Sequence, residues 1–115
     1  MAREISGNLW FVPAECLGSA HGFHSGSEQL RSTLRELRDQ FAYVLIDASP
    51  LGLYADAAVL GQATDGVVLV LEANATRRVA ARNAKETLEA ANVRLLGTVL
   101  NNRTFPIPEK IYRKL

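Results

Sequence analysis

Polar residues that could do chemistry follow three largely apolar runs in this sequence. Asp47, residues 72–74 (Glu-Ala-Asn) and Asn101 each come directly after such a run. A carboxylate at the end of a buried strand can hold a hydrated Mg²⁺ ion on a bound nucleotide. The same aspartate can instead cap the turn that follows it, and the residues alone leave both interpretations open.

The run before Asp47 predicts a strand that is covered on both faces. Residues 43–46 (Tyr-Val-Leu-Ile) are apolar, and Ala-Ser-Pro follows the aspartate as a turn. Such a short, continuous run is typical of a parallel sheet. Because the carboxyl ends of parallel strands lie along one edge, we expect Asp47, residues 72–74 and Asn101 on the same rim. The alternative is that these polar residues only begin loops.

The chain before that run predicts one strand and one helix. Residues 9–13 predict a strand that ends at a proline. Ser25 and Glu28 have the spacing of a capping box at the start of a helix. The apolar stripe of this helix consists of Leu30, Leu34, Leu37 and Phe41.

The rest of the chain alternates helices with strands. Residues 54–63 predict a short helix, residues 67–71 the strongest strand, and residues 93–100 a third core strand. Thr76 is expected to cap a long helix that ends near Asn92. The predicted buried stripe of that helix is Ala80, Ala84, Leu88 and Ala91. The alternation predicts an α/β fold, a mostly parallel sheet with flanking helices.

Composition narrows the class of protein. The chain has 115 residues, is 48% hydrophobic and carries a net charge of +1, which gives no electrostatic case for a nucleic-acid partner. Cys16 is the single cysteine, and the N-terminus lacks the apolar core of a signal peptide. We therefore expect a soluble domain in the cytoplasm. His21 and His24 have no third ligand nearby, so we interpret them as loop histidines.

Six segments between about residue 9 and residue 101 resemble, in order, the bacterial tyrosine kinase family of exopolysaccharide and capsule biosynthesis. This family belongs to the deviant-Walker P-loop ATPases. Residues 43–50 (YVLIDASP) look like its Walker B segment, y-v-i-I-D-t-P-P. The other matching segments are residues 9–14 (LWFVPA), 56–57 (DA), 65–70 (DGVVLV), 76–78 (TRR) and 96–101 (LGTVLN).

The resemblance implies a partial, N-terminally truncated P-loop NTPase-like fold of three layers. It implies ATP and Mg²⁺ as cofactors and protein tyrosine phosphorylation as the family's activity. Asp47 is then the Walker B carboxylate, which holds Mg²⁺ through water or helps to activate the attacking hydroxyl. Asn101 matches the asparagine that faces the adenine edge. Asp56 and Thr76 match family positions to which we assign no role.

The sequence also departs from the family. It contains no G-x-x-x-x-G-K-[ST] phosphate-binding loop, and the glycine-rich residues 18–26 include no lysine. Lys85 is the first lysine, well after the Walker B segment, and Tyr112 stands alone where the family has a tyrosine cluster. Phosphoryl transfer depends on positioning and neutralising the phosphates. We therefore expect these 115 residues to be inactive as a kinase on their own.

Three hypotheses follow for the function. The chain is the C-terminal part or a truncated homologue of such a kinase, or it is a non-catalytic module that self-associates or binds a membrane polysaccharide co-polymerase. In the third, it is a half-site that binds ATP only with another chain. All three predict a homo-oligomer or a partner chain over the open sheet edge, and a place at the inner face of the membrane is compatible with them. Residues 1–102 are expected to form the domain, and residues 103–115 a basic and apolar tail.

Overall fold

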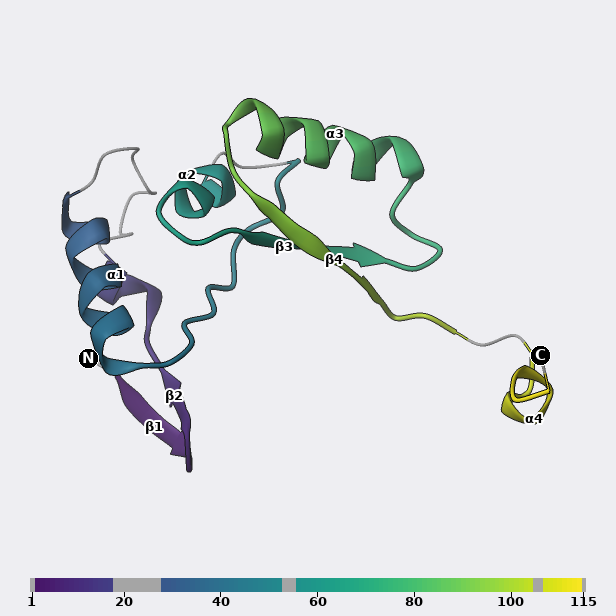
Figure 1. The fold of residues 1–115 in the computed structure, drawn as a ribbon, viewed down its shortest axis with the longest axis horizontal. Helices are drawn as coiled ribbons and strands as arrows, with labels where there is room; N and C mark the ends of the chain where they lie inside the picture. Colours follow the sequence, from purple (N-terminus) through teal and green to yellow (C-terminus); the bar gives the residue numbers. More distant parts are fainter. Residues whose placement is uncertain (1, 18–27, 53–55, 105–106, 115) are drawn as a thin grey trace. The chain divides into compact units, whose positions relative to one another are not determined.

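The computed structural model describes residues 2–17, 28–52, 56–104 and 107–114. The chain divides into two compact units, Met1–Thr64 and Asp65–Leu115, which we call the N-terminal and C-terminal units (Figure 1). The fold is mixed α/β, and the described residues contain one parallel and one antiparallel pair of strands. No helix in the described part of the chain has the length and apolarity of a membrane span.

The N-terminal unit begins with a β-hairpin. Strand β1 (Arg3–Ser6) pairs antiparallel with β2 (Leu9–Phe11). The two-residue turn between them includes Gly7, whose φ of 50° is a conformation that glycine adopts without steric cost. The strand predicted at residues 9–13 is therefore present over Leu9–Phe11. Its partner β1 escaped prediction because its four residues, Arg-Glu-Ile-Ser, include a single apolar side chain and so form no apolar run.

Helices supply the core of the N-terminal unit. They are the short 3₁₀ helix η1 (Ala14–Leu17), α1 (Glu28–Gln40) and α2 (Asp56–Gln62). Leucines from all three form the core, with the half-buried Leu34 and Phe41 packed against it, and these leucines are Leu17, Leu30, Leu37 and Leu60. The predicted apolar stripe of α1 is confirmed, whereas Ser25 lies outside the described residues.

The strand predicted at residues 43–46 is wrong for this structure. Residues 43–50 form neither helix nor strand. Ile46 packs against the core of the N-terminal unit, but Tyr43 is 90% and Leu45 96% exposed. A strand exists only when a neighbour completes its hydrogen bonds. Among the described residues none pairs with this segment, so its apolar run forms an irregular segment whose Tyr43, Val44 and Leu45 are exposed.

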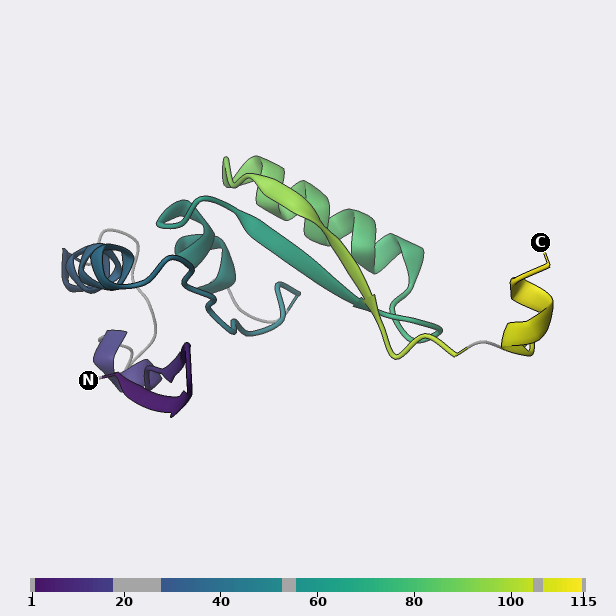
Figure 2. The same cartoon turned by 60° about the horizontal axis from the view of Figure 1, so that its bottom comes forward.

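The C-terminal unit is a β–α–β arrangement. Strands β3 (Val67–Glu72) and β4 (Leu95–Asn101) are parallel neighbours, and helix α3 (Arg78–Ala90) connects them along one face of the pair (Figures 1 and 2). The predicted strand 67–71 is confirmed, and the one predicted at 93–100 begins two residues later. A short helix, α4 (Glu109–Tyr112), lies near the end of the chain.

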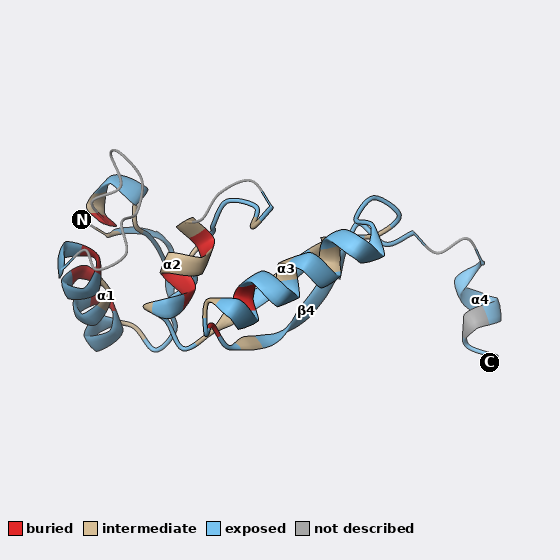
Figure 3. Ribbon diagram, turned by 90° about the horizontal axis from the view of Figure 1, so that it is seen from above, coloured by how far each residue is buried: buried red, intermediate tan, exposed pale blue. Residues whose placement is uncertain are grey.

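Helix α3 buries a narrow stripe. Leu88 is fully buried, Ala81, Ala84 and Ala91 are half-buried, and Ala80 is exposed, as the burial colours of Figure 3 show for the helix as a whole. The prediction of Ala80 in the stripe was wrong by one residue. Residues three and four positions before Ala84 both neighbour it on the helix surface. Both are alanine, Ala81 and Ala80, so the sequence does not distinguish them.

The two ends of α3 differ from each other in how well they are capped. The N-cap residue is Arg77, whose side chain makes no capping hydrogen bond, so the prediction of Thr76 as the cap is wrong. At the other end the Asn92 N–H donates to Glu89 O and the Val93 N–H donates to Leu88 O, at 3.0 and 2.9 Å. With a φ of 55° at Asn92, this is a Schellman motif, and it confirms the helix end predicted there.

Candidate functional site

The C-terminal ends of β3 and β4 lie side by side and form a polar rim. Glu72, the last residue of β3, is in register with Asn101, the last residue of β4. The Ala73 N–H donates to Asn101 O at 2.8 Å, which extends the pairing by one bond past the strand. Two of the three polar segments expected on one rim, residues 72–74 and Asn101, therefore do lie together.

Thr76 closes the turn that follows β3. Its Oγ1 accepts the Glu72 N–H at 2.9 Å, and its own N–H donates to Glu72 O, also at 2.9 Å. The threonine thus bonds backward to the strand instead of forward into α3. This reciprocal pair fixes residues 73–75 in a tight loop above the end of the strand.

Two asparagines adopt left-handed backbone conformations directly after the two strands. Asn74 has a φ of 62° and Asn102 a φ of 54°, values that asparagine tolerates better than most residues. Asn102 Nδ2 donates to Glu72 Oε1 at 3.3 Å, so the end of β4 is linked to the end of β3 through side chains. Clustering of such conformations at one edge is a frequent feature of functional sites.

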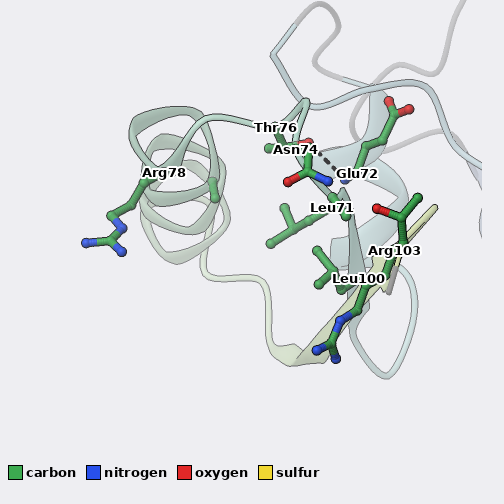
Figure 4. Close-up of a pocket in the computed structure, with 10 residues that line it drawn as sticks. Leu71, Glu72, Asn74, Thr76, Arg78, Leu100 and Arg103 are labelled. Atoms are coloured by element: carbon green, nitrogen blue, oxygen red, sulfur yellow. Dashed lines mark hydrogen bonds between the residues drawn. The ribbon is translucent and has the colours of Figure 1, made fainter. Parts of the chain in front are cut away.

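An open pocket lies at this rim on the α3 side of the sheet (Figure 4). Its volume is about 440 Å³. Leu71, Leu100 and Ala81 supply apolar surface, and Arg78 and Arg103 stand at its margins. The other lining residues are Glu72, Ala73, Asn74, Thr76 and Thr104. Asn101 does not line this pocket, although Leu100 and Arg103 on either side of it do.

The sequence did not single out Arg78, Asn102 or Arg103 as site residues. Arg78 is part of the segment 76–78 that resembles the family, Asn102 is the last residue of the expected domain, and Arg103 is the first residue of the expected tail. Recurrence of asparagine after both strands, at 74 and at 101–102, is the signal that could have marked the rim. The side chains of Glu72, Asn74 and Asn102 are exposed, so the rim is accessible to a ligand.

Asp47 belongs to the N-terminal unit. Its side chain is exposed and follows Ile46, which is anchored in the core of that unit. Its expected place beside Asn101, and the roles of both residues, stay predictions. In the described part of the chain no three His, Cys, Asp or Glu side chains cluster as a metal site. His21 and His24 lie outside the described residues.

Comparison with known proteins gives a consistent set of relatives. The chain is 38% identical over 68 residues to tyrosine-protein kinase CpsD of Streptococcus agalactiae, a match that covers 59% of this chain and 30% of that protein. It is 32% identical over 91 residues to tyrosine-protein kinase YwqD of Bacillus subtilis, which covers 79% of this chain and 35% of that protein. No family model matches the chain.

A solved structure agrees with these relatives. The kinase domain of VpsO superposes with a TM-score of 0.64 at 31% identity, over 68% of this chain and 38% of that domain. The chain spans about a third of the length of the curated relatives that it matches. Over the region that it shares with them, the chain belongs to the bacterial tyrosine kinases of capsule biosynthesis.

Proposed function

We propose that this chain supplies the Walker B carboxylate and the base-side rim of an ATP site in a kinase of capsule or exopolysaccharide biosynthesis, and that it is not catalytic alone. The observation that carries the proposal is the parallel alignment of β3 and β4, which brings Glu72, Asn74 and Asn102 to one edge beside an open pocket. Ligands of α/β proteins bind outside the carboxyl ends of parallel strands.

The rim suits a heteroaromatic base. Leu71, Leu100 and Ala81 give the pocket an apolar surface that a ring can cover. Carboxamides and backbone groups at the margin offer both donors and acceptors, which recognition of a base edge requires. In this proposal Asn101 contributes the donor and acceptor pair that the family resemblance assigns to it, from a position just outside the pocket.

The phosphates are the part of the ligand for which these residues offer least. The sequence has no lysine before Lys85 and no phosphate-binding loop of the Walker A type. Asp47 is an exposed carboxylate that can hold Mg²⁺ through water. ATP and Mg²⁺ are thus the proposed ligands, and a P-loop carried by further polypeptide would have to complete the site before phosphoryl transfer.

Manganese binding tests the role of Asp47. Mn²⁺ replaces Mg²⁺ at oxygen ligands and broadens the NMR signals of nearby amides. We expect selective broadening at residues 46–48 when Mn²⁺ is added with ATP, and loss of that broadening in Asp47→Asn. Asp39→Asn removes another exposed carboxylate of the same unit and is the matched control. Broadening that survives in Asp47→Asn would refute the Walker B assignment.

A second candidate function is a non-catalytic interaction module, bound to a copy of itself or to a membrane polysaccharide co-polymerase at the inner face of the membrane. It is favoured by the bare apolar surface around the segment 43–46, with Leu45 96% exposed, and on β3, where Val70 is 61% exposed. Chemical-shift changes on ATP addition decide between the two candidates. Chemical-shift changes at Asn74, Asn102 and Arg103 support the nucleotide site. Their absence at about 10 mM ATP, a concentration that would fill even a site of millimolar affinity, favours the interaction module.

A further inference from the structure

The outer edge of β4 carries none of the features that usually protect an edge strand. Its seven residues, Leu95–Asn101, include no charged side chain and no proline. Natural edge strands are commonly blunted by lysine, proline or a covering segment, because their free N–H and C=O groups can pair with another chain. Within the described residues, β3 is the only strand that pairs with β4.

Exposure distinguishes β4 from its neighbour. Residues of β3 alternate between half-buried and exposed, as expected for a strand with one face under a helix. In β4 every residue after Leu95 is exposed, which includes both faces of the strand. Leu96 is 53%, Val99 49% and Leu100 54% exposed. Helix α3 therefore leaves apolar side chains of β4 uncovered above and below the sheet.

The register shows which backbone groups are free for pairing. Asn101 O accepts a hydrogen bond from the Ala73 N–H on the β3 side, so Asn101 directs its backbone groups toward β3. Backbone groups of successive strand residues point to opposite edges. Val99 thus faces β3 as Asn101 does, and Thr98 and Leu100 present their N–H and C=O to the outer edge.

We propose that this edge pairs with β4 of a second copy of the chain, antiparallel and about a two-fold axis at Thr98. This register sets Thr98 opposite Thr98 and Leu96 opposite Leu100 of the second copy. Thr–Thr and apolar cross-strand pairs stabilise antiparallel strands. The result is a four-stranded sheet in which the exposed leucines of each copy cover those of the other.

Charge is compatible with this pairing. Residues 65–115 contain nine Lys and Arg against five Asp and Glu, a net charge of +4, so close approach of two C-terminal units needs a contact free of opposed cations. In the proposed register Arg94 lies opposite Asn102 and not opposite another cation. The neutral β4 is a stretch of this unit where two copies can meet without repulsion between directly opposed charges.

The dimer is independent of nucleotide and weak. A pairing of two seven-residue strands buries less than the roughly 1,000 Å² of a stable interface, so we expect a dissociation constant on the order of 100 µM. Sedimentation velocity on the full chain from about ten-fold below to ten-fold above that value should show a shift from monomer to dimer. A wild-type chain that stays monomeric at the highest concentration would overturn the proposal.

Substitutions at the axis test the register. Thr98→Lys places two ammonium groups opposite each other and Thr98→Glu two carboxylates, so each variant alone should lose the dimer by at least about ten-fold in affinity. An equal mixture of the two should recover it, because Lys then faces Glu. Thr98→Val keeps the backbone N–H and the β propensity and should dimerise like the wild type.

The mixture also separates loss of pairing from loss of folding. Two unfolded variants would not form a dimer when combined, and circular dichroism of each variant should match the wild type. A Thr98→Lys chain that dimerises as well as the wild type would place the contact elsewhere. Failure of the mixture to dimerise would overturn the axis at Thr98. Neither result bears on nucleotide binding, since no nucleotide is added.

Discussion

Residues 43–46 and residues 67–71 are similar apolar runs, each followed by an acidic residue, yet they adopt different structures in their two units. The second run forms β3, paired with β4 and covered by α3. The first remains an irregular segment whose Leu45 is almost wholly exposed. An apolar run thus predicts the capacity to form a strand, while a neighbouring strand decides whether one forms.

The two units also differ in net charge. The N-terminal unit has four Lys and Arg against seven Asp and Glu, a net charge of −3, whereas the C-terminal unit has +4. The overall charge of +1 hides this difference. The C-terminal unit has its sheet and its closed turns in place, so we expect its rim to persist without further polypeptide.

The largest expected change in the free energy of unfolding is the difference between substitutions of two leucines, one from each region. Leu88→Ala removes a fully buried side chain from α3 and should lower the free energy of unfolding by about 2–5 kcal/mol. Leu45→Ala removes a side chain that is 96% exposed and should change it by no more than about 0.5 kcal/mol. Urea unfolding followed by circular dichroism measures both. Equal losses of unfolding free energy in the two variants would contradict the difference in burial between Leu88 and Leu45.

Much of this contrast could be predicted from sequence, and part could not. Helical periodicity identified α1 and the buried Leu88, because the spacing of apolar residues in a helix depends only on local geometry. The pairing of residues 43–46 depends on distant residues, so no local pattern reveals it. At the rim, the predicted residues 72–74 and Asn101 do meet. Arg78 and Arg103 were missed because exposed arginines carry no distinguishing local signal.

A substitution at Gly66 tests the close approach of the chain just before β3 to the backbone at the start of β4. A Cβ at this position would lie 2.8 Å from Arg94 O and 2.7 Å from Leu96 Cγ. Because a backbone atom cannot give way, Gly66→Ala should destabilise the chain by about 1–3 kcal/mol. Gly52→Ala, where a Cβ meets nothing within 4 Å, should change stability by less than about 0.5 kcal/mol. Thermal unfolding of the two variants provides the measurement, and an unchanged midpoint in Gly66→Ala would refute the contact.

Substitutions at Asn92 test whether the Schellman motif ends α3. Its left-handed conformation costs alanine more than asparagine or glycine, so Asn92→Ala should lose about 1 kcal/mol of stability. Asn92→Gly should match or exceed the wild type, because glycine adopts this φ freely. Chemical denaturation of the pair decides the point. If alanine and glycine have the same effect, the Schellman motif is not what ends the helix in solution.

Thr76 is expected to have the smallest effect. Thr76→Val removes the Oγ1 that accepts the Glu72 N–H in an exposed hydrogen bond, and should cost about 0.5 kcal/mol, with faster amide exchange at Glu72. Thr87→Val is the control, since that hydroxyl donates only to Asn83 O within α3. Hydrogen exchange measured by NMR resolves the two residues. Unchanged protection of Glu72 in Thr76→Val would mean that the turn is held by other bonds.

The proposed incomplete ATP site is tested most directly by a calorimetric titration of the 115-residue chain with ATP and Mg²⁺, together with an assay for transfer of labelled phosphate. We expect binding no tighter than about 1 mM, because these residues offer the phosphates neither the lysine nor the loop of a Walker A motif, and we expect no phosphate transfer to tyrosine. Micromolar binding with phosphate transfer that is lost in Asp47→Asn would contradict it, since these residues would then contain a complete kinase site.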